Sequence, residues 1–166
     1  MSITVLEAKQ AILEVLYSYC RALDRMDRAL AGTLFQEGAI VDYGEYFNGT
    51  ADDFVEWVWA AHAGFDAHSH QVTNVLIEIG DGDGGEGAVS ESYVTAQLYR
   101  RGDGDGPGIL VTSRGRYLDR WSCRGGRWAI DQRRYVDDIT EMGSSPATLG
   151  SGHRDRDDPS YEVFPP

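Results

Sequence analysis

Three residues of this chain of 166 residues have side chains that could together carry out acid–base chemistry. Asp24 lies at the end of a predicted helix, Tyr43 follows Asp42 in a predicted strand, and His70 lies in a later strand. A buried carboxylate beside a histidine can hold the imidazole in one tautomer and raise its basicity. Such a histidine is a competent general base near neutral pH. A tyrosine hydroxyl nearby can donate a hydrogen bond to a carbonyl, a leaving hydroxyl group or a water molecule.

Each of the three residues also has an ordinary structural explanation. An Asp at a helix end is often a cap or a solvated residue. A His in a strand is often a structural residue whose hydrogen bonds are satisfied. Tyr43 could be an aromatic residue of the core or of its rim. Taken one at a time, the residues leave these alternatives open.

A glycine motif elsewhere in the chain does not indicate a nucleotide site. Gly80, Gly82 and Gly85 match the pattern GxGxxG after a predicted strand. A dinucleotide site needs a helix next, because the helix N-terminus holds the pyrophosphate. The segment that follows contains Val89 and Tyr93 and is typical of a strand. We therefore expect a hairpin turn here.

No metal or cofactor is predicted from the side chains. The aspartates of the predicted turns at 80–87 and 102–108 lack the Glu that an EF-hand needs at loop position 12. His68 and His70 share one strand face, but no Cys or third His lies at ligand spacing and the HEXXH motif is absent. A GxSxG elbow is also absent, so a hydrolase triad is not supported.

The charge of the chain argues against nucleic acid and acidic membrane surfaces as partners. The formal net charge is −12, and the single lysine, Lys9, and 14 arginines are scattered among 27 acidic residues. No apolar run approaches the roughly 20 residues that span a bilayer. Residues 1–10 do not resemble a secretory signal. We expect a cytoplasmic protein with reduced thiols at Cys20 and Cys123.

The first third of the chain is predicted to be mainly helical. Apolar residues recur every three or four positions over residues 4–24, which predicts an amphipathic helix. A shorter helix is expected from Asp27 to about residue 36, a strand over residues 39–43, and a third helix from Thr50 to about Gly64.

The rest of the chain changes to a β pattern. The predicted strands cover residues 68–79, 88–101, 109–122 and 127–139. Local turns join them, which predicts an antiparallel meander, and helices followed by a curled sheet define an α+β class. We expect one domain over residues 1–142 and an irregular tail over residues 143–166.

Several short segments together resemble one known family. They are ALDRMD (22–27), HQVTN (70–74), GRY (115–117) and RWAI (127–130). In this order and spacing they resemble the SnoaL-like branch of the nuclear transport factor 2-like superfamily, and within it the scytalone dehydratase-like enzymes. The resemblance covers about residues 5–140. It implies a cone-shaped, cystatin-like α+β barrel in which N-terminal helices wrap a curved, mostly antiparallel sheet around one deep pocket.

The resemblance also implies roles for the candidate residues. Asp24 matches an aspartate that orients the catalytic histidine, and His70 matches the base that removes a proton from a substrate carbon. Tyr43 falls where a tyrosine helps to activate the leaving hydroxyl group. Arg133 or Arg134 corresponds to a pocket arginine of some relatives.

The chain departs from the family pattern at two places. Leu23 precedes Asp24, at the position where scytalone dehydratase has a tyrosine. No second pocket histidine is expected, since His62 and His68 lie elsewhere in the sequence. These departures argue against scytalone itself as the substrate.

The predicted function is a cofactor-independent lyase that acts on a small hydrophobic, aromatic or polycyclic hydroxylated substrate. A retro-aldol carbon–carbon lyase, an isomerase or cyclase, and a non-catalytic binding or oligomerisation module are the alternatives. The resemblance implies a homo-oligomer, either a trimer or a dimer. Asn74 is expected on the same strand face as His70. The candidate aromatic lining residues are Tyr17, Tyr19, Phe54, Trp57 and Trp59.

Overall fold

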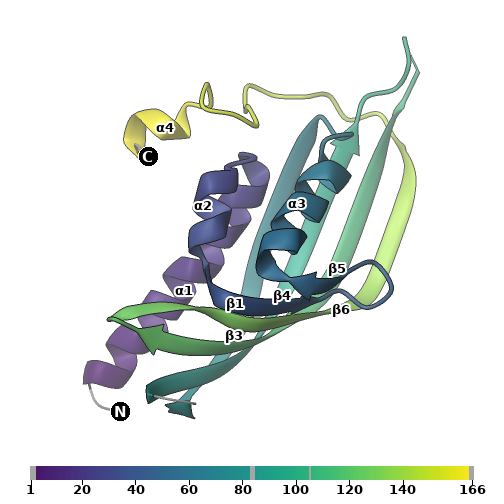
Figure 1. The fold of residues 1–166 in the computed structure, drawn as a ribbon. Helices are drawn as coiled ribbons and strands as arrows, with labels where there is room; N and C mark the ends of the chain where they lie inside the picture. Colours follow the sequence, from purple (N-terminus) through teal and green to yellow (C-terminus); the bar gives the residue numbers. More distant parts are fainter. Residues whose placement is uncertain (1–2, 83–84, 105, 165–166) are drawn as a thin grey trace.

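The computed structural model of the chain describes residues 3–82, 85–104 and 106–164 (Figure 1). Helices come first and a long curved sheet follows, which is the predicted α+β class. None of the described helices combines the length and the apolar composition needed to cross a membrane. The elements are α1 (Ile3–Asp24), α2 (Arg28–Thr33), β1 (Phe35–Asp42), β2 (Asn48–Thr50), α3 (Ala51–His62), β3 (Ala67–Gly82), β4 (Gly85–Arg100), β5 (Gly108–Arg124), β6 (Arg127–Ser145) and α4 (Ser160–Val163).

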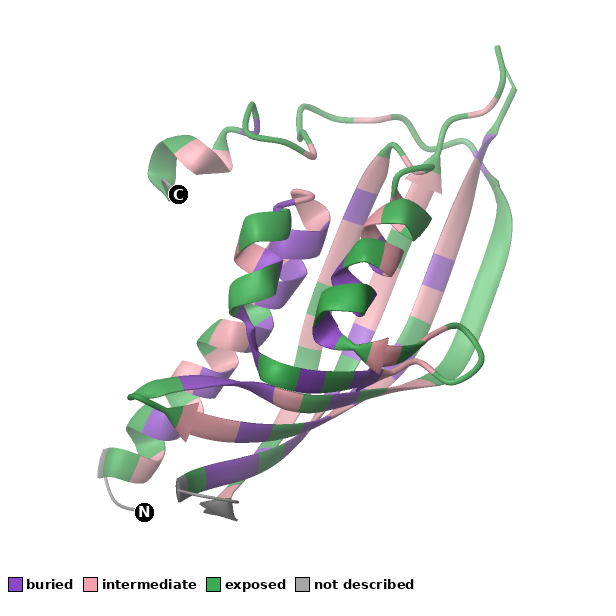
Figure 2. Ribbon diagram, viewed as in Figure 1, coloured by how far each residue is buried: buried purple, intermediate pink, exposed green. Residues whose placement is uncertain are grey.

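Helix α1 is the predicted amphipathic helix. Ile12, Leu16, Tyr19 and Leu23 are almost completely buried, as their spacing requires for residues on one helix face. Figure 2 shows buried residues on one side of α1 and exposed residues on the other. The helix therefore presents one continuous apolar stripe to the inside of the molecule.

The end of α1 is fixed by a tight backbone turn. Met26 has a left-handed conformation with φ of 49°, its N–H donates to the carbonyl of Leu23, and the N–H of Asp27 donates to the carbonyl of Ala22. This is the hydrogen-bond pattern of a Schellman cap, with Met in the position that glycine usually takes. The side chain of Asp27 then caps the start of α2. Asp24 is thus held as the last residue of the helix.

Helix α3 begins at a capping pair of the kind the sequence predicts. The Thr50 hydroxyl accepts from the N–H of Asp53 and donates to its carboxylate. Phe54 and Val58 are buried on the inner side of the helix. Because α3 lies across the sheet (Figure 1), the residues of its last turns face the sheet.

The six strands form one sheet in the order β2-β1-β6-β5-β4-β3. The hairpins β3–β4, β4–β5 and β5–β6 are antiparallel and confirm the predicted meander. Strand β1 pairs with β6 in parallel, and β2 pairs with β1. The sequence does not predict the pairing of β1 with β6, because these strands are far apart in the chain and no local pattern connects them. It also does not predict the three-residue strand β2.

Bulges bend the long strands into a curved sheet. Strands β3 to β6 have 16 to 19 residues, whereas strands usually have about 3–10. The register shifts between Thr73 and Leu76 of β3 and at two places in the β5–β6 pairing, where β6 has the extra residue. Each bulge increases the local bend and twist. A Cβ on Gly115 would lie 2.3 Å from the carbonyl oxygen of Val136, so glycine is required at that bulge. The curvature wraps the sheet around α1 and α3.

A buried ion pair lies on the inner face of the sheet. The register places Asp119 of β5 opposite Arg133 of β6, and both side chains are fully buried. Two hydrogen bonds of 2.8 and 2.7 Å join the guanidinium to the carboxylate. The guanidinium carbon lies 4.3 Å from the centre of the Tyr19 ring and 4.0 Å from that of Tyr117. This pair therefore connects α1 to β5 and β6.

Several predicted boundaries differ from the structure. Strand β1 begins at Phe35 rather than residue 39, so α2 ends at Thr33 and not near residue 36. The glycine motif forms a hairpin as expected, but the strands extend to Gly82 and from Gly85. Asp83 and Asp105 of the predicted turns lie outside the described residues. Strand β6 continues to Ser145, and the division into a domain of residues 1–142 and a tail stays a prediction.

The C-terminal segment packs on its own chain across the ends of α1 and α2 (Figure 1). Asp158 forms an ion pair of 3.1 Å with Arg25. Asp27 accepts hydrogen bonds from Arg156 and from the hydroxyl of Tyr161. Between β6 and the short helix α4 the segment has no regular helix or strand. Its polar side chains hold the turn that follows Asp24.

Replacing Asp119 by Ala is expected to lower the free energy of unfolding by about 3–5 kcal/mol, because it leaves a buried guanidinium unpaired. Urea denaturation monitored by circular dichroism measures the change. The double variant Asp119→Ala/Arg133→Met is expected to recover most of the loss. Asp138→Ala is the matched control, since its pair with Arg116 is exposed and such pairs contribute little. A loss in Asp119→Ala no larger than in this control would contradict the role of the buried pair.

Candidate active site

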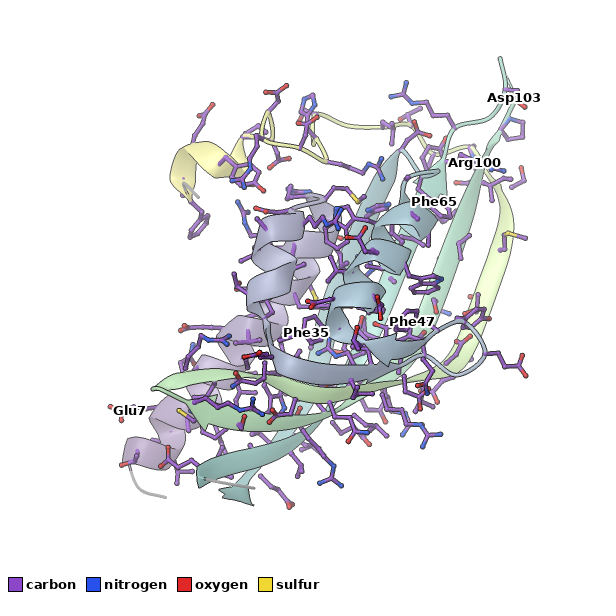
Figure 3. The ribbon with its side chains drawn as sticks, viewed as in Figure 1. Glu7, Phe35, Phe47, Phe65, Arg100 and Asp103 are labelled. Carbon is purple, nitrogen blue, oxygen red and sulfur yellow. The ribbon has the colours of Figure 1, made fainter. Side chains whose placement is uncertain are left out.

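A cavity of about 290 Å³ lies between the sheet, α1 and α3, close to the lower end of about 300–1,000 Å³ for small-molecule sites. Phe65, just beyond α3, and Phe47, before its start, lie at opposite ends of that helix (Figure 3). The aromatic and apolar lining residues are Tyr19, Leu23, Tyr43, Tyr46, Trp57, Val58, Ala61, Phe65, Val94, Ala96, Leu98, Val111 and Tyr117. The polar lining residues are His62, His70, Ser113, Tyr135, Asp137 and Thr140.

His70 lines this cavity and is in direct contact with Asp24, which is not itself a lining residue. Nδ1 of His70 lies 2.7 Å from Oδ1 of Asp24, and the side chains of His70 and Asp24 are only 4% and 17% exposed. The backbone N–H of His70 also donates to both carboxylate oxygens, at 3.0 and 3.1 Å. Because a carboxylate only accepts, this contact places the proton on Nδ1 and leaves Nε2 with a lone pair.

The position of Asp24 is unfavourable for the helix that carries it. The carboxyl end of a helix has partial negative charge, so an acidic side chain in the last turn is destabilising. Asp24 is the last residue of α1. The three hydrogen bonds from His70 offset this cost, and they hold the carboxylate against Nδ1 of the imidazole.

Two tyrosines, Tyr19 and Tyr43, line the same cavity as His70. The hydroxyl groups of Tyr19 and Tyr43 are 3.1 Å apart. Burial raises the pKa of Tyr43 well above its ordinary value, and it also raises the pKa of Tyr19. Both phenols therefore keep their protons at neutral pH. One proton is used in the bond between them, and the other is free to be donated into the cavity. Tyr19, Tyr43 and Trp57 all line the cavity.

The expectation of no second pocket histidine is wrong. His62 lines the cavity, and its ring lies 5.6 Å from that of His70 with an interplanar angle of 28°. Burial, assisted by the charges of His68, His70 and Arg154, lowers the pKa of His62 to about 3. The ring is therefore neutral at ordinary pH. The last turn of α3 brings His62 to the dyad, and the helical phase of residues 54, 58, 61 and 62 is the signal that could have indicated it.

His68 is a structural residue that ties the C-terminal segment to α1. Its Nδ1 lies 3.3 Å from the carbonyl oxygen of Leu23, and its Nε2 lies 2.9 Å from Nη1 of Arg154. Since Arg154 can only donate, Nε2 accepts and Nδ1 carries the proton. Burial lowers the pKa of His68 to about 4. In the ranges that the structure describes, no three His, Cys, Asp or Glu side chains are grouped closely enough to hold a metal ion.

Three residues predicted to bind substrate lie outside the cavity. Tyr17 is 52% exposed, because two positions along a helix turn a side chain away from Tyr19. Asn74 is exposed in the bulge of β3 with φ of 49°, and the bulge breaks the alternation that would align it with His70. Arg134 is exposed beside Asp42, since neighbours in a strand point to opposite faces.

The remaining candidates belong to the layer beneath the cavity. Arg133 contacts the rings of Tyr19 and Tyr117 from below and is not a lining residue. Phe54 is fully buried in the core. The indole N–H of Trp59 donates to the carbonyl of Met26. These side chains support the cavity wall without reaching its interior.

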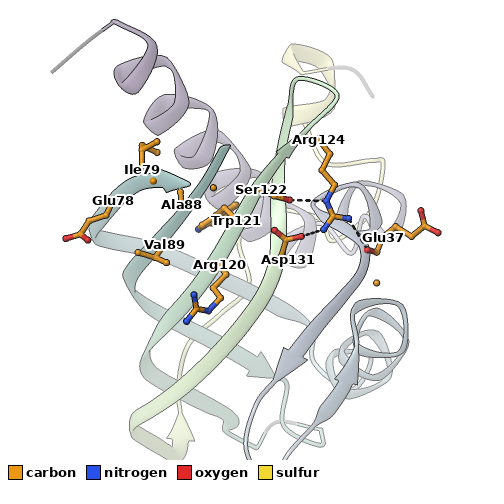
Figure 4. Close-up of a pocket in the computed structure, with 13 residues that line it drawn as sticks. Glu37, Glu78, Ile79, Ala88, Val89, Arg120, Trp121, Ser122, Arg124 and Asp131 are labelled. Atoms are coloured by element: carbon orange, nitrogen blue, oxygen red, sulfur yellow. Dashed lines mark hydrogen bonds and ion pairs between the residues drawn. The ribbon is translucent and has the colours of Figure 1, made fainter. Parts of the chain in front are cut away.

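A second hollow of about 490 Å³ lies over the other ends of the strands and shares no residue with the dyad cavity (Figure 4). Two of its charged groups, Arg124 and Asp131, form an ion pair. Arg124 donates to Ser122, Asp131 and the carbonyl of Glu37. We take the cavity lined by His70 as the candidate active site, because His70 is the residue that contacts Asp24.

Comparison with known proteins identifies the family. The model of the SnoaL-like domain matches residues 4–134, so the chain belongs to the SnoaL-like family. No curated protein sequence matches it. The fold resembles that of a provisionally assigned scytalone dehydratase from Novosphingobium aromaticivorans, with a TM-score of 0.71 and 22% identity over 91% of this chain and 100% of the other.

Two further structures have the same fold. A type 2 hexachlorocyclohexane dehydrochlorinase, LinA, has a TM-score of 0.71 and 12% identity, with 89% of this chain and 96% of that chain covered. A protein of unknown function with a cystatin-like fold from Nostoc punctiforme has a TM-score of 0.60 and 22% identity, with 83% and 96% covered. These likenesses confirm the predicted nuclear transport factor 2-like, cystatin-like architecture.

Acid is expected to destabilise the fold through His62 and His68. An unfolded histidine has a pKa of about 6.5, whereas in the fold the pKa of His62 is about 3 and that of His68 about 4. Below pH of about 6.5 the unfolded chain therefore binds protons that the folded chain does not. The free energy of unfolding should fall by up to about 1.4 kcal/mol per pH unit for each histidine.

Urea unfolding at several pH values between about 7 and about 5 measures this slope. His62→Gln is expected to remove about half of it. His153→Gln is the matched control, because His153 is exposed, and it should leave the slope unchanged. Equal slopes in the wild type and in His62→Gln would contradict the assignment.

Proposed function

We propose that the chain is a cofactor-independent lyase in which the Asp24–His70 dyad removes a proton from a substrate carbon. The observation that carries this proposal is the 2.7 Å contact between Nδ1 of His70 and Oδ1 of Asp24. It leaves Nε2 as a base in a largely apolar cavity. The SnoaL-like family assignment supports the proposal, as do the names of the two similar structures, a dehydratase and a dehydrochlorinase.

The proposed elimination begins when Nε2 of His70 takes the proton from carbon. Asp24 stabilises the imidazolium that forms and keeps the ring in place. The electron pair of the broken C–H bond forms the new carbon–carbon double bond, and the leaving group departs from the adjacent carbon. A positioned base of this kind typically contributes about 10²–10⁴ in rate.

Tyr43 is proposed to stabilise the leaving group. Because burial raises the pKa of Tyr43, it donates a hydrogen bond and does not give up its proton. Tyr19, 3.1 Å away, can in turn donate to Tyr43. Where the leaving group is a hydroxyl, the imidazolium returns the proton to it, so that water leaves and His70 is neutral again.

The proposed substrate is small, hydrophobic and aromatic or polycyclic. The described lining residues include several aromatic rings and no Lys or Arg, so the cavity offers stacking surfaces and no cation for a carboxylate or phosphate. A homo-oligomeric state, as a dimer or a trimer, and a cytoplasmic location stay predictions.

Asp24→Asn and His70→Ala are each expected to lower turnover by about 10²–10⁴, because they remove the orientation or the base itself. Tyr43→Phe is expected to cost about 10²–10³, as the loss of one donor to developing charge does. Product release from a panel of hydroxylated aromatic compounds, followed by mass spectrometry, measures these effects.

The matched control for this series is Tyr17→Phe, since Tyr17 carries the same hydroxyl on the exposed face of α1. It should leave turnover unchanged. Unchanged turnover in both Asp24→Asn and His70→Ala would exclude the dyad as the base. If the wild type releases a different small molecule from the substrate, such as an aldehyde, the dyad stays the proposed base and only the proposed leaving group changes.

A further inference from the structure

A row of paired residues crosses the sheet from His70 to a second polar region of the cavity. His70 of β3 pairs with Ala96 of β4, Ala96 pairs with Ser113 of β5, and Ser113 pairs with Thr140 of β6. All four residues line the cavity. Neighbouring strands are about 4.8 Å apart, so Ser113 lies about 10 Å from His70 along the sheet. The small side chain of Ala96 leaves the space between them open.

The second polar region is a chain of hydrogen bonds, which we call the rim network and define as Ser113, Tyr135, Asp137 and Thr140. Oγ of Ser113 lies 2.7 Å from the hydroxyl of Tyr135 and 2.9 Å from Oγ1 of Thr140. The Thr140 hydroxyl donates to Asp137, with both carboxylate oxygens at 3.0 Å. The network therefore ends on a negative charge.

The carboxylate fixes the direction of every bond in the rim network. Thr140 has one hydroxyl proton, which it gives to Asp137, so it must accept from Ser113. Ser113 in turn must accept from Tyr135. Each donor of the network is thus already used, and only lone pairs remain toward the cavity. Bonds aligned in this way strengthen one another, so the rim network is suited to accept a hydrogen bond and unsuited to donate one.

The charge around the cavity also favours an uncharged hydrogen-bond donor as the ligand. Asp137 is the acidic group of the rim network, and no Lys or Arg is among the described lining residues. An anionic substrate would meet repulsion at the rim network and find no compensating cation. An uncharged substrate with an O–H or N–H donor would complete the unused acceptors.

We propose that the rim network is a specificity site that selects uncharged, planar substrates with a hydroxyl or N–H donor about two strand spacings from the reacting carbon. Such a molecule lies across Ala96, with the reacting carbon at His70 and the donor at Ser113 and Thr140. This inference rests on the proposed function for the identity of the reacting end. The recognition of the donor is a separate property of β5 and β6.

The test compares two probes with the same ring system, 2,6-dihydroxynaphthalene and its dimethyl ether, 2,6-dimethoxynaphthalene, which has no O–H donor in either orientation. Their binding is measured by quenching of tryptophan fluorescence, because Trp57 lines the cavity. The diol is expected to bind about tenfold more tightly, as one hydrogen bond to a charge-assisted acceptor provides. 6-Hydroxy-2-naphthoate is expected to bind more weakly than the diol. Equal affinities of the diol and the dimethyl ether would overturn the proposal.

Variants locate the preference in the rim network. Thr140→Val keeps the branched shape of an exposed strand residue and should abolish the preference for the diol, and Ser113→Ala should do the same. Glu141→Gln is the matched control, because Glu141 follows Thr140 on β6 and pairs with Arg114 on the other face of the sheet. It should keep the preference. A full preference in Thr140→Val would overturn the proposal.

One further variant separates this inference from the proposed function. Asp24→Asn impairs the proposed base but retains the imidazole of His70, so it should keep the preference for the diol. Its turnover tests the dyad, whereas its binding of the two probes tests the rim network. The turnover result can therefore contradict the dyad without contradicting the rim network, and the binding result can contradict the rim network without contradicting the dyad.

Discussion

The carboxylate of Asp24 receives three hydrogen bonds from His70, and this contact joins the end of α1 to the first strand of the meander. It requires that α1 ends at one particular residue. The left-handed Met26 provides that ending, and His68 binds the carbonyl of Leu23, one residue before the carboxylate. The C-terminal segment holds the same turn from outside. An acidic residue at the carboxyl end of a helix lowers the stability of that helix. Asp24 is retained there because its carboxylate must face the imidazole of His70.

Charge is arranged in layers around the cavity. A guanidinium, that of Arg133, lies beneath it, fully buried and paired with Asp119. The rings of Tyr19 and Tyr117 lie against this cation, and both residues line the cavity. Burial raises the pKa of both phenols, so they stay protonated. The dyad and the rim network contribute acidic groups at two edges of the cavity. No Lys or Arg is among the described lining residues, and the proposed specificity for uncharged ligands rests on this distribution of charge.

The sequence predicts those features that depend on neighbouring residues. Helical periodicity and capping residues are sufficient for α1 and α3, and turn residues are sufficient for the meander. Asp24 and His70 were found from residue type and from the family resemblance. Features set by register could not be found in this way: the bulge removes Asn74 from the cavity, cross-strand pairing buries Arg133 with Asp119, and the packing of α3 brings His62 to the dyad. Each depends on contacts between segments that are distant in the chain.

The proposed chemistry depends on which nitrogen of His70 carries the proton in the neutral ring. Nitrogen NMR of protein labelled at the histidine rings distinguishes the two tautomers directly. We expect Nδ1 to be protonated and Nε2 to have the chemical shift of a free lone pair, and we expect the Nδ1 signal of His70 to change in Asp24→Asn. A proton on Nε2 of His70 in the wild type, or a His70 signal that is the same in Asp24→Asn, would contradict the dyad.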